Sequence, residues 1–185
     1  MKTFDEVMAF TRTVSSNAAY EDNECNLLWA MAAGVREYGV ILEVGCELGR
    51  STTILAQVAK ERHQHLICID PFLTHDPPET AASFMRTMRN VGCPFTLYAM
   101  TTEAAMRTMS SQMRLDLLHL DGDHTTEGIE TDCWWLLVLL RKGGYLCVHD
   151  YGRDSLPTVK PAIDRHVDGW ESVERVGSLA VWRKP

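Results

Sequence analysis

The sequence has no excess of basic residues and no long apolar run. Its 18 Lys and Arg residues are outnumbered by 25 Asp and Glu residues, so the formal net charge is −7. Nucleic-acid-binding proteins usually gather Lys and Arg on one face against phosphate, so we expect no nucleic acid partner. The most apolar stretch, Cys133 to Leu140, is too short to span a bilayer, so we expect no membrane partner.

The sequence also lacks a CxxC motif and a signal-peptide pattern. Its six cysteines are spread along the chain, several of them within apolar runs, which indicates buried thiols in a reducing compartment. The first ten residues, MKTFDEVMAF, carry acids where a signal peptide would need an apolar stretch. We therefore predict a cytoplasmic protein.

The length and pattern of the chain predict one α/β domain over residues 1–185, with a helical segment at 1–39 packed on it. From Val40 onward, short β-rich runs alternate with helical patterns, as in a mostly parallel sheet covered by helices on both faces. The predicted strands are Val40–Val44, His65–Asp70, Phe95–Met100, Asp116–Asp121 and Tyr145–Asp150. The predicted helices are Ser51–Arg62, Glu79–Asn90, Glu103–Ser111, Thr126–Leu140 and Thr158–Val167.

The end of the chain breaks this alternation. Trp170–Val176 and Ser178–Arg183 are strand-like and leave no room for a helix between them, so they predict an antiparallel hairpin. The Lys142-Gly143-Gly144 segment predicts a helix stop before the fifth strand. The expected fold is a doubly wound, Rossmann-like sheet of seven strands that ends in the hairpin.

A glycine-punctuated turn follows the first predicted strand. Gly45 and Gly49 would let the backbone approach a ligand, and Ser51 or Thr52 could cap the next helix. The G-x-G-x-x-G pattern of dinucleotide sites is not met, because Glu47 replaces its second glycine and would repel a pyrophosphate. A cofactor without phosphate, such as the sulfonium S-adenosylmethionine (SAM), fits better. The alternatives are a ligand-free turn and a nicotinamide-dependent oxidoreductase.

Acids and histidines close the later strands. Asp70 follows Gly45 by 25 residues, close to the spacing of a ribose-binding acid, although it could also form the turn before Pro71. Two further groups of residues end the fourth and fifth predicted strands, and we expect them to share one crevice because the carboxyl ends of parallel strands meet at one edge. These groups are Asp121, Asp123 and His124, and His149 and Asp150.

These motifs resemble class I SAM-dependent methyltransferases, in particular the small-molecule O-methyltransferases that include sugar and catechol enzymes. The resemblance covers Val40 to the C-terminus, with the closing hairpin as a further match. It implies that SAM binds at the glycine turn, with Asp70 on the ribose and Thr101 or Thr102 near the adenine. The implied cofactor residues are Glu43, Gly45, Cys46, Gly49, Ser51, Asp70, Pro71, Thr102 and Asp121.

The sequence departs from the family at two places. Thr101 stands where many members have an acid, which leaves the adenine contact open. His149 and Asp150 stand where metal-dependent members place two oxygen ligands. Because Mg²⁺ prefers oxygen, the histidine leaves manganese, zinc or no metal as alternatives.

The predicted reaction is methyl transfer to a small hydroxylated acceptor. A divalent cation held by Asp121, His149 and Asp150 would lower the pKa of the acceptor hydroxyl, and His124 would be the general base, with Asp123 as its substitute. The alternative for His124 is a capping or supporting role, and the alternative for the whole chain is a non-catalytic SAM-binding module. No motif indicates an oligomeric state, so a homodimer is the default expectation.

Overall fold

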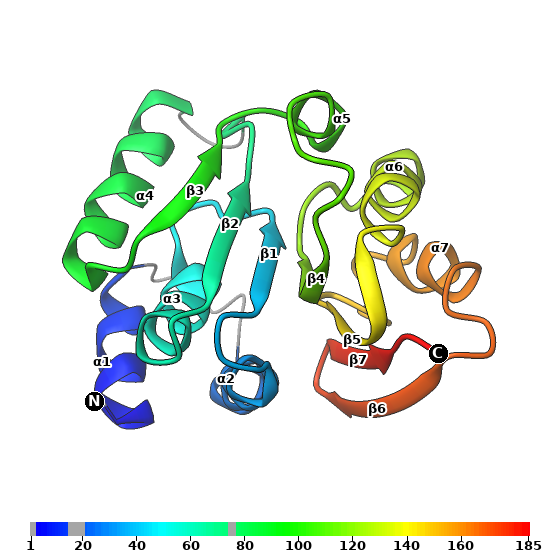
Figure 1. Cartoon of the computed structure of the whole chain (residues 1–185), viewed down its shortest axis with the longest axis horizontal. Coiled ribbons are helices and arrows are strands. Elements are labelled where there is room, and N and C mark those ends of the chain that lie inside the picture. The colour runs from blue at the N-terminus through cyan, green and yellow to red at the C-terminus, as the bar shows by residue number, and fades with distance from the viewer. Residues whose placement is uncertain (1–2, 15–20, 74–76) are drawn as a thin grey trace.

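The computed structural model describes residues 3–14, 21–73 and 77–185. Within them, seven strands form one sheet in the order β3-β2-β1-β4-β5-β7-β6 (Figure 1). The strands are β1 (Val40–Val44), β2 (His65–Ile69), β3 (Phe95–Tyr98), β4 (Leu115–Leu120), β5 (Leu140–Val148), β6 (Glu171–Val176) and β7 (Leu179–Arg183). The helices are α1 (Phe4–Val14), α2 (Asp22–Gly34), α3 (Arg50–Glu61), α4 (Pro77–Val91), α5 (Thr102–Met106), α6 (Thr126–Leu136) and α7 (Val159–Asp164).

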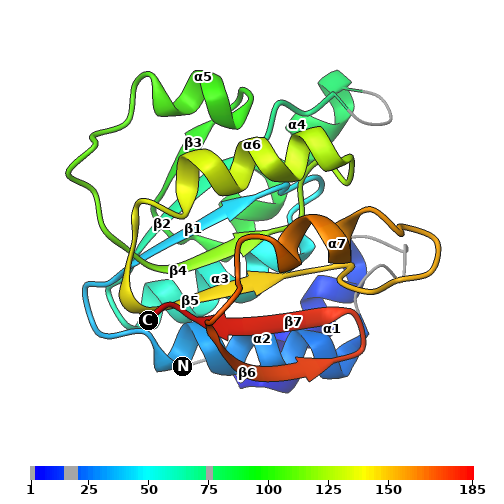
Figure 2. The same cartoon turned by 90° about the vertical axis from the view of Figure 1, so that its right-hand side faces the viewer.

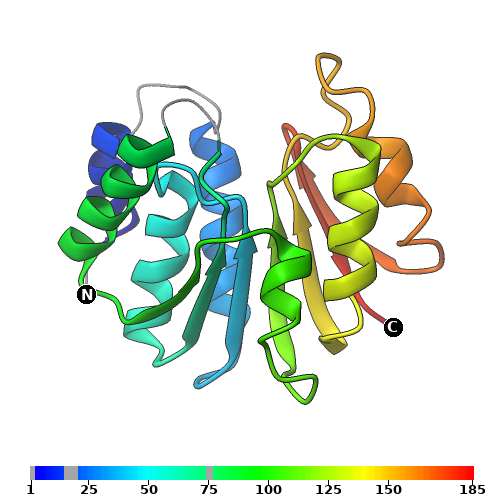
Figure 3. The same ribbon diagram turned by 90° about the horizontal axis from the view of Figure 1, so that it is seen from above.

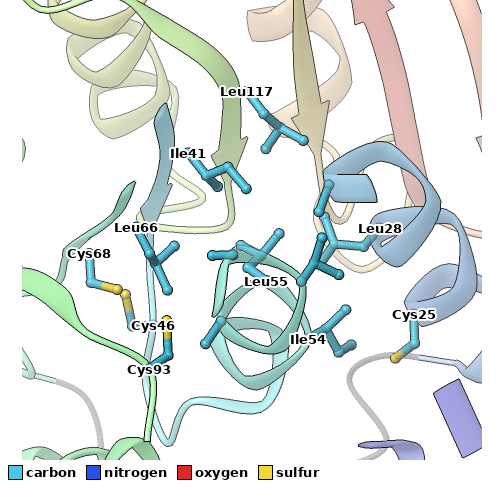
Figure 4. Close-up of a cluster of buried hydrophobic side chains, with 14 of the residues drawn as sticks. Cys25, Leu28, Ile41, Cys46, Ile54, Leu55, Leu66, Cys68, Cys93 and Leu117 are labelled. Carbon is cyan, nitrogen blue, oxygen red and sulfur yellow. The ribbon is translucent and has the colours of Figure 1, made fainter. Parts of the chain in front are cut away.

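Helices cover both faces of the sheet. Figure 2 shows α6 and α7 along one face of the sheet and α1 and α2 along the other, and in Figure 3 α5 lies on the side of α6 and α7, and α3 and α4 on the side of α1 and α2. Successive strand residues point to opposite faces, so Ile41 packs in the cluster of α1 to α4 and Leu42 in that of α5 to α7. In the first cluster, Ile41, Leu66 and Leu117 face Leu55 of α3 (Figure 4). Burial on both faces explains why these strands read as continuous apolar runs.

The strand order places a topological switch at the centre of the sheet. From β1 the chain builds outward through β2 and β3, and then returns to the other side of β1 to form β4 and β5. These five strands are parallel, whereas β7 pairs antiparallel with both β5 and β6. The predicted seven-stranded, mostly parallel fold with a closing hairpin is confirmed. Ligands of such sheets bind beyond the carboxyl ends of the strands at the switch point, here between β1 and β4.

The predicted boundary between α6 and β5 was wrong. The helix ends at Leu136 rather than Leu140, and Lys142-Gly143-Gly144 lies inside β5 instead of stopping a helix. Gly143 has φ of +72°, and the register of β5 against β4 shifts in this region. The Gly143 N–H donates to the Lys184 carbonyl at 2.8 Å, so strand pairing that is distant in sequence accommodates the two glycines as a bulge.

No described helix is long and apolar enough to cross a membrane. All six cysteines are buried and unpaired, as their positions in apolar runs predicted. Cys46, in the loop that follows β1, lies beside Cys68 of β2 (Figure 4).

One acid is buried in the layer that contains α6. Asp132 is 8% exposed, and its carboxyl group is hydrogen-bonded to Thr102. Burial raises the pKa of Asp132 from its ordinary value of 3.8 to about 6, against the lowering effect of the Thr102 hydrogen bond and with a further increase from Asp123. An acid whose pKa is higher in the folded state loses stabilisation as pH rises, here from about pH 4 through about pH 6.

We therefore expect Asp132→Asn to stabilise the protein at about pH 8, by about 1 to 3 kcal/mol, because the variant no longer buries a charge. At about pH 4 the gain should vanish, since Asp132 is then protonated in the folded protein. Urea denaturation at the two pH values measures the difference, with Asp154→Asn as an exposed control. An equal gain at both pH values would contradict the explanation.

Candidate active site

The loop after β1 is wedged between the ends of β2 and β4. Gly45 has φ of +84°, and a Cβ atom at this position would lie 1.9 Å from the Asp121 carbonyl oxygen. The Gly45 N–H donates to Ile69, and the Asp121 N–H donates to Val44. Gly49 has φ of +91° and immediately precedes α3. Only glycine at position 45 allows this close approach, so the loop lies at the switch point that the fold provides.

Asp70 holds this loop in place. Its Oδ2 accepts hydrogen bonds of 2.7 Å from the backbone N–H groups of Cys46 and Glu47, and its Oδ1 accepts one of 2.6 Å from Phe72. The carboxylate therefore stabilises the turn that contains the exposed Pro71 and also supports the loop after β1. An ionised carboxylate has about four acceptor positions, so these bonds still leave capacity for a ligand hydroxyl.

Glu43 lies fully buried below the loop. Its Oε1 accepts a 2.6 Å hydrogen bond from Ser51 Oγ and lies 3.2 Å from Nδ1 of His119, whereas Oε2 has no hydrogen-bond partner. The sequence reasoning missed His119, which is the register partner of Glu43 on β4. Its signal was a single histidine in the mostly apolar run Leu115–Leu120, all of which is buried.

Asp121, His124 and Asp150 meet beyond the ends of β4 and β5. The Nε2 atom of His124 lies 3.1 Å from Asp150 Oδ2 and 3.5 Å from Asp121 Oδ1. These three side chains each offer one ligand atom within 4.8 Å of the others. The carboxylates of Asp121 and Asp150 raise the pKa of His124 to about 9, so it is protonated near neutral pH. Asp150 has φ of +57°, a left-handed conformation that Asp tolerates better than most residues.

His149 lies behind the two carboxylates. Its Nδ1 is 3.2 Å from Asp121 Oδ1 and 3.6 Å from Asp150 Oδ2. On its other edge, Nε2 lies 3.5 Å from Glu24 of α2 and 3.3 Å from Ser178 Oγ. Burial lowers the pKa of His149, but the three carboxylates outweigh burial and raise that pKa to about 11.

The two histidines in turn lower the pKa values of the acids. Burial raises the pKa of Asp121, but His124 and His149 outweigh it and bring the pKa to about 2. For Asp150, burial is likewise outweighed by both histidines and Arg153, so its pKa falls well below the ordinary value. The site is thus a charged network of carboxylates and imidazolium groups.

The sequence reasoning also missed Glu24 and Ser178. Glu24 continues the apolar stripe of α2 that contains Leu27, Leu28 and Met31, and an acid on such a stripe was the available signal. Ser178 lies in the β6–β7 turn and carries no pattern of its own.

Three other predicted site residues have local partners. Thr101 caps α5 by accepting a hydrogen bond from the Ala104 N–H, and Thr102 is buried against Asp132. Asp123 is exposed, and its Oδ1 accepts a 2.8 Å hydrogen bond from the Thr125 N–H at the start of α6. The structure therefore gathers His124 with the carboxylate pair, while Asp123 serves the adjoining turn.

Comparison with known proteins places this geometry in a family. The family described as "Methyltransferase domain" matches residues 42–151, which include the glycine loop, Asp70, Asp121 and Asp150. Comparison of the sequence with curated proteins gave no match.

Solved structures share the fold. An O-methyltransferase from Bacillus cereus in complex with S-adenosylhomocysteine (SAH) has a TM-score of 0.66 at 16% identity, over 100% of this chain and 92% of that chain. SAH-bound methyltransferase PaMTH1 of Podospora anserina has a TM-score of 0.69 at 15% identity, over 98% and 86%. A TDP-rhamnose 3′-O-methyltransferase of calicheamicin biosynthesis has a TM-score of 0.70 at 15% identity, over 99% and 96%.

At these identities the structural likeness establishes the fold alone, whereas the sequence match establishes the family. It covers more than half of the chain and contains the central strands with their loops. The resemblance found in the sequence motifs is thereby confirmed at the level of the family. The chain belongs to the methyltransferase domain family.

Proposed function

We propose that the protein is a SAM-dependent O-methyltransferase that acts on a small hydroxylated acceptor with the help of a divalent cation. The observation that carries this proposal is the convergence of the glycine loop, Asp70 and the Asp121–Asp150 pair at the carboxyl ends of β1, β2, β4 and β5. Ligands of doubly wound sheets bind at this position. Two SAH-bound methyltransferases of the same fold support the choice of donor, and the TDP-rhamnose 3′-O-methyltransferase, which also has this fold, supports the choice of acceptor.

The residues at the switch point suit the parts of SAM. The methionine end would lie along the Gly45–Gly49 loop, above Cys46 and near Glu43 and Ser51, where an acidic environment favours the sulfonium and the ammonium. Asp70 would accept from the ribose hydroxyls beside Pro71. Thr102 would lie near the adenine, and Asp121 near the reacting methyl group.

The donor set of Asp121, His124 and Asp150 fits a divalent cation. Two carboxylates and one imidazole suit Mn²⁺ or Zn²⁺ better than Mg²⁺, which prefers oxygen throughout. A cavity of about 20 Å³ beside Asp121, His124 and His149 is large enough for one water-sized group. In addition, Nε2 of His124 is buried without a hydrogen bond of good geometry. We therefore assign His124 to the ligand set and His149 to a supporting position.

A bound divalent cation would lower the pKa of an acceptor hydroxyl and help to fix its position. Asp121 and Asp150 would hold the acceptor side of the site and the glycine loop would hold the methyl donor, an arrangement that would align the two reactants for an in-line displacement. The general-base role is the alternative to this ligand role, and in it His124 could accept a proton only after it loses its own, because the adjacent carboxylates keep it protonated near neutral pH. Its assignment as general base thus stays a prediction, as does that of Asp123.

Three further features of the protein also remain proposals. The six buried, unpaired thiols support a cytoplasmic location, where disulfides are rare. A homodimer and a single domain over residues 1–185 are still predictions.

The decisive experiment combines binding and turnover. Calorimetry should show that the protein binds SAM and does not bind NADH. Methyl transfer from methyl-labelled SAM to a panel of catechols and sugars should fall on addition of EDTA and return with Mn²⁺. Failure to bind SAM would overturn the proposal, and SAM binding without transfer to any acceptor would favour a non-catalytic module. Methyl transfer that is insensitive to EDTA would exclude a role for the divalent cation.

His124→Ala separates the possible roles of this histidine. We expect turnover to fall by about 100-fold or more, while SAM affinity changes by less than about twofold. If His124 is a cation ligand, Mn²⁺ affinity measured by EPR should also decrease. Lost turnover with unchanged Mn²⁺ affinity would instead favour the general base, and unchanged turnover would exclude His124 from the mechanism. His63→Ala, an exposed histidine before β2 and thus at the opposite edge of the sheet, is the control.

A further inference from the structure

Glu24 is a buried acid that none of the methyltransferase motifs includes. It lies on α2, before the residues matched by the family, and is 2% exposed. Its Oε1 accepts hydrogen bonds from Ser178 N (2.7 Å) and Ser178 Oγ (2.9 Å). Its Oε2 accepts one of 2.8 Å from the Glu21 N–H and lies 3.5 Å from His149 Nε2. The carboxylate therefore joins α2, the β6–β7 turn and the residue after β5.

The imidazole of His149 is held from both edges. Glu24 lies at Nε2, and Asp121 and Asp150 lie at Nδ1. At Nε2 the ring also lies 3.3 Å from Ser178 Oγ, which donates to Glu24, so Glu24 contacts the ring directly as an ion pair and indirectly through Ser178. A ring with partners on opposite edges has its plane and position defined, and a displaced ring would disturb the acids on both edges. The side chain of His149 is 1% exposed, so bulk solvent does not reach these contacts.

The β6–β7 turn is shaped around the Glu24 carboxylate. Gly177 has φ of +56°, and a Cβ atom there would lie 2.5 Å from Glu24 Oε1. A side chain at position 177 would thus displace the carboxylate that Ser178 binds. This close approach is independent of the hydrogen bonds and indicates that the turn is built to accept an acid at this point.

Packing alone does not account for an acid at position 24. The position continues the apolar stripe of α2, where Leu or Met would fill the space without the desolvation cost of a carboxylate. Burial of a carboxylate is offset when it is hydrogen-bonded and paired, and Glu24 accepts from Glu21 and Ser178 and lies 3.5 Å from His149 Nε2. The acid therefore makes physical sense as part of the network that reaches Asp121 and Asp150.

We propose that Glu24 is a positioning residue, which fixes His149 and through it the carboxylates of Asp121 and Asp150. This inference rests on the proposed function for its consequence in catalysis. Its structural part, the orientation of His149, stands on the contacts alone. The site would then be completed by two segments outside the matched residues 42–151, namely the start of α2 and the β6–β7 turn.

The test replaces Glu24 with Gln, which keeps the shape and an acceptor for Ser178 but removes the charge that faces His149. Mutations of residues that support metal ligands typically weaken metal affinity or activity by about 10- to 100-fold. We expect Mn²⁺ affinity, measured by EPR, and kcat to fall within this range in Glu24→Gln. SAM affinity and the KM for SAM should change by less than about twofold, since the contacts of Glu24 are with Glu21, Ser178 and His149, none of which belongs to the glycine loop.

Asp22→Asn is the matched control, because it removes a carboxylate from the same turn of α2 at an exposed position beside Arg12. It should leave Mn²⁺ affinity and kcat unchanged. Gly177→Ala is a second variant that displaces the Glu24 carboxylate without changing any charge, and it should reproduce the effect of Glu24→Gln.

NMR of the imidazole nitrogens gives a readout that needs neither metal nor turnover. In the wild-type protein the Nε2–H of His149 should exchange slowly with solvent, and in Glu24→Gln it should exchange faster or lose its signal. Wild-type Mn²⁺ affinity together with an unchanged His149 signal in the variant would overturn the inference. If the wild-type protein bound neither SAM nor Mn²⁺, the proposed function would fail, while the His149 signal would still decide the role of Glu24.

Discussion

The site depends on the balance of charge between two carboxylates that end adjacent strands. Asp121 and Asp150 are brought together by the parallel pairing of β4 and β5, and two acids at such a distance repel each other unless cations lie between them. His124 and His149 supply that charge, as the rise in their pKa values and the fall in those of the acids show. A cation at His124 and a proton on His124 would serve the same electrostatic purpose. The site is therefore suited to exchange the proton on His124 for a bound cation.

The backbone around this network is held with little freedom. Asp70 accepts hydrogen bonds from two backbone N–H groups of the loop after β1. The absence of a Cβ at Gly45 lets this loop lie against the Asp121 carbonyl. The loop and the carboxylate pair are thus mechanically connected through the backbone at the end of β4. A preformed loop of this kind binds a ligand without paying for its own ordering, which favours affinity.

The site is formed both by residues that match the family and by residues that flank the match. The matched residues 42–151 contain the loop, Asp70, Asp121, His124 and Asp150, while Glu24 and Ser178 come from either side of that stretch. The mixed sheet brings these segments together. Because β7 pairs antiparallel with β5, the β6–β7 turn that contains Ser178 lies at the carboxyl end of β5, next to His149. The first helices and the final hairpin therefore contribute to the chemistry of the site as well as to its cover.

Most of the fold could be predicted from the sequence, because the patterns that indicate strands, helices and turns are local. The apolar run Val40–Val44 indicates a strand, and the spacing of Gly45 and Gly49 indicates a turn after it. The carboxyl ends of parallel strands lie at one edge of the sheet, so the proximity of Asp121 and Asp150 could be expected. What local patterns cannot report is pairing between distant residues. Strand pairing includes Gly143 in β5, and tertiary packing brings His119 into contact with Glu43 and Glu24 into contact with His149. The sequence alone determined which residues could bear the chemistry, whereas the tertiary structure decided which of them touch, because burial and charge pairing act between segments that are far apart along the chain.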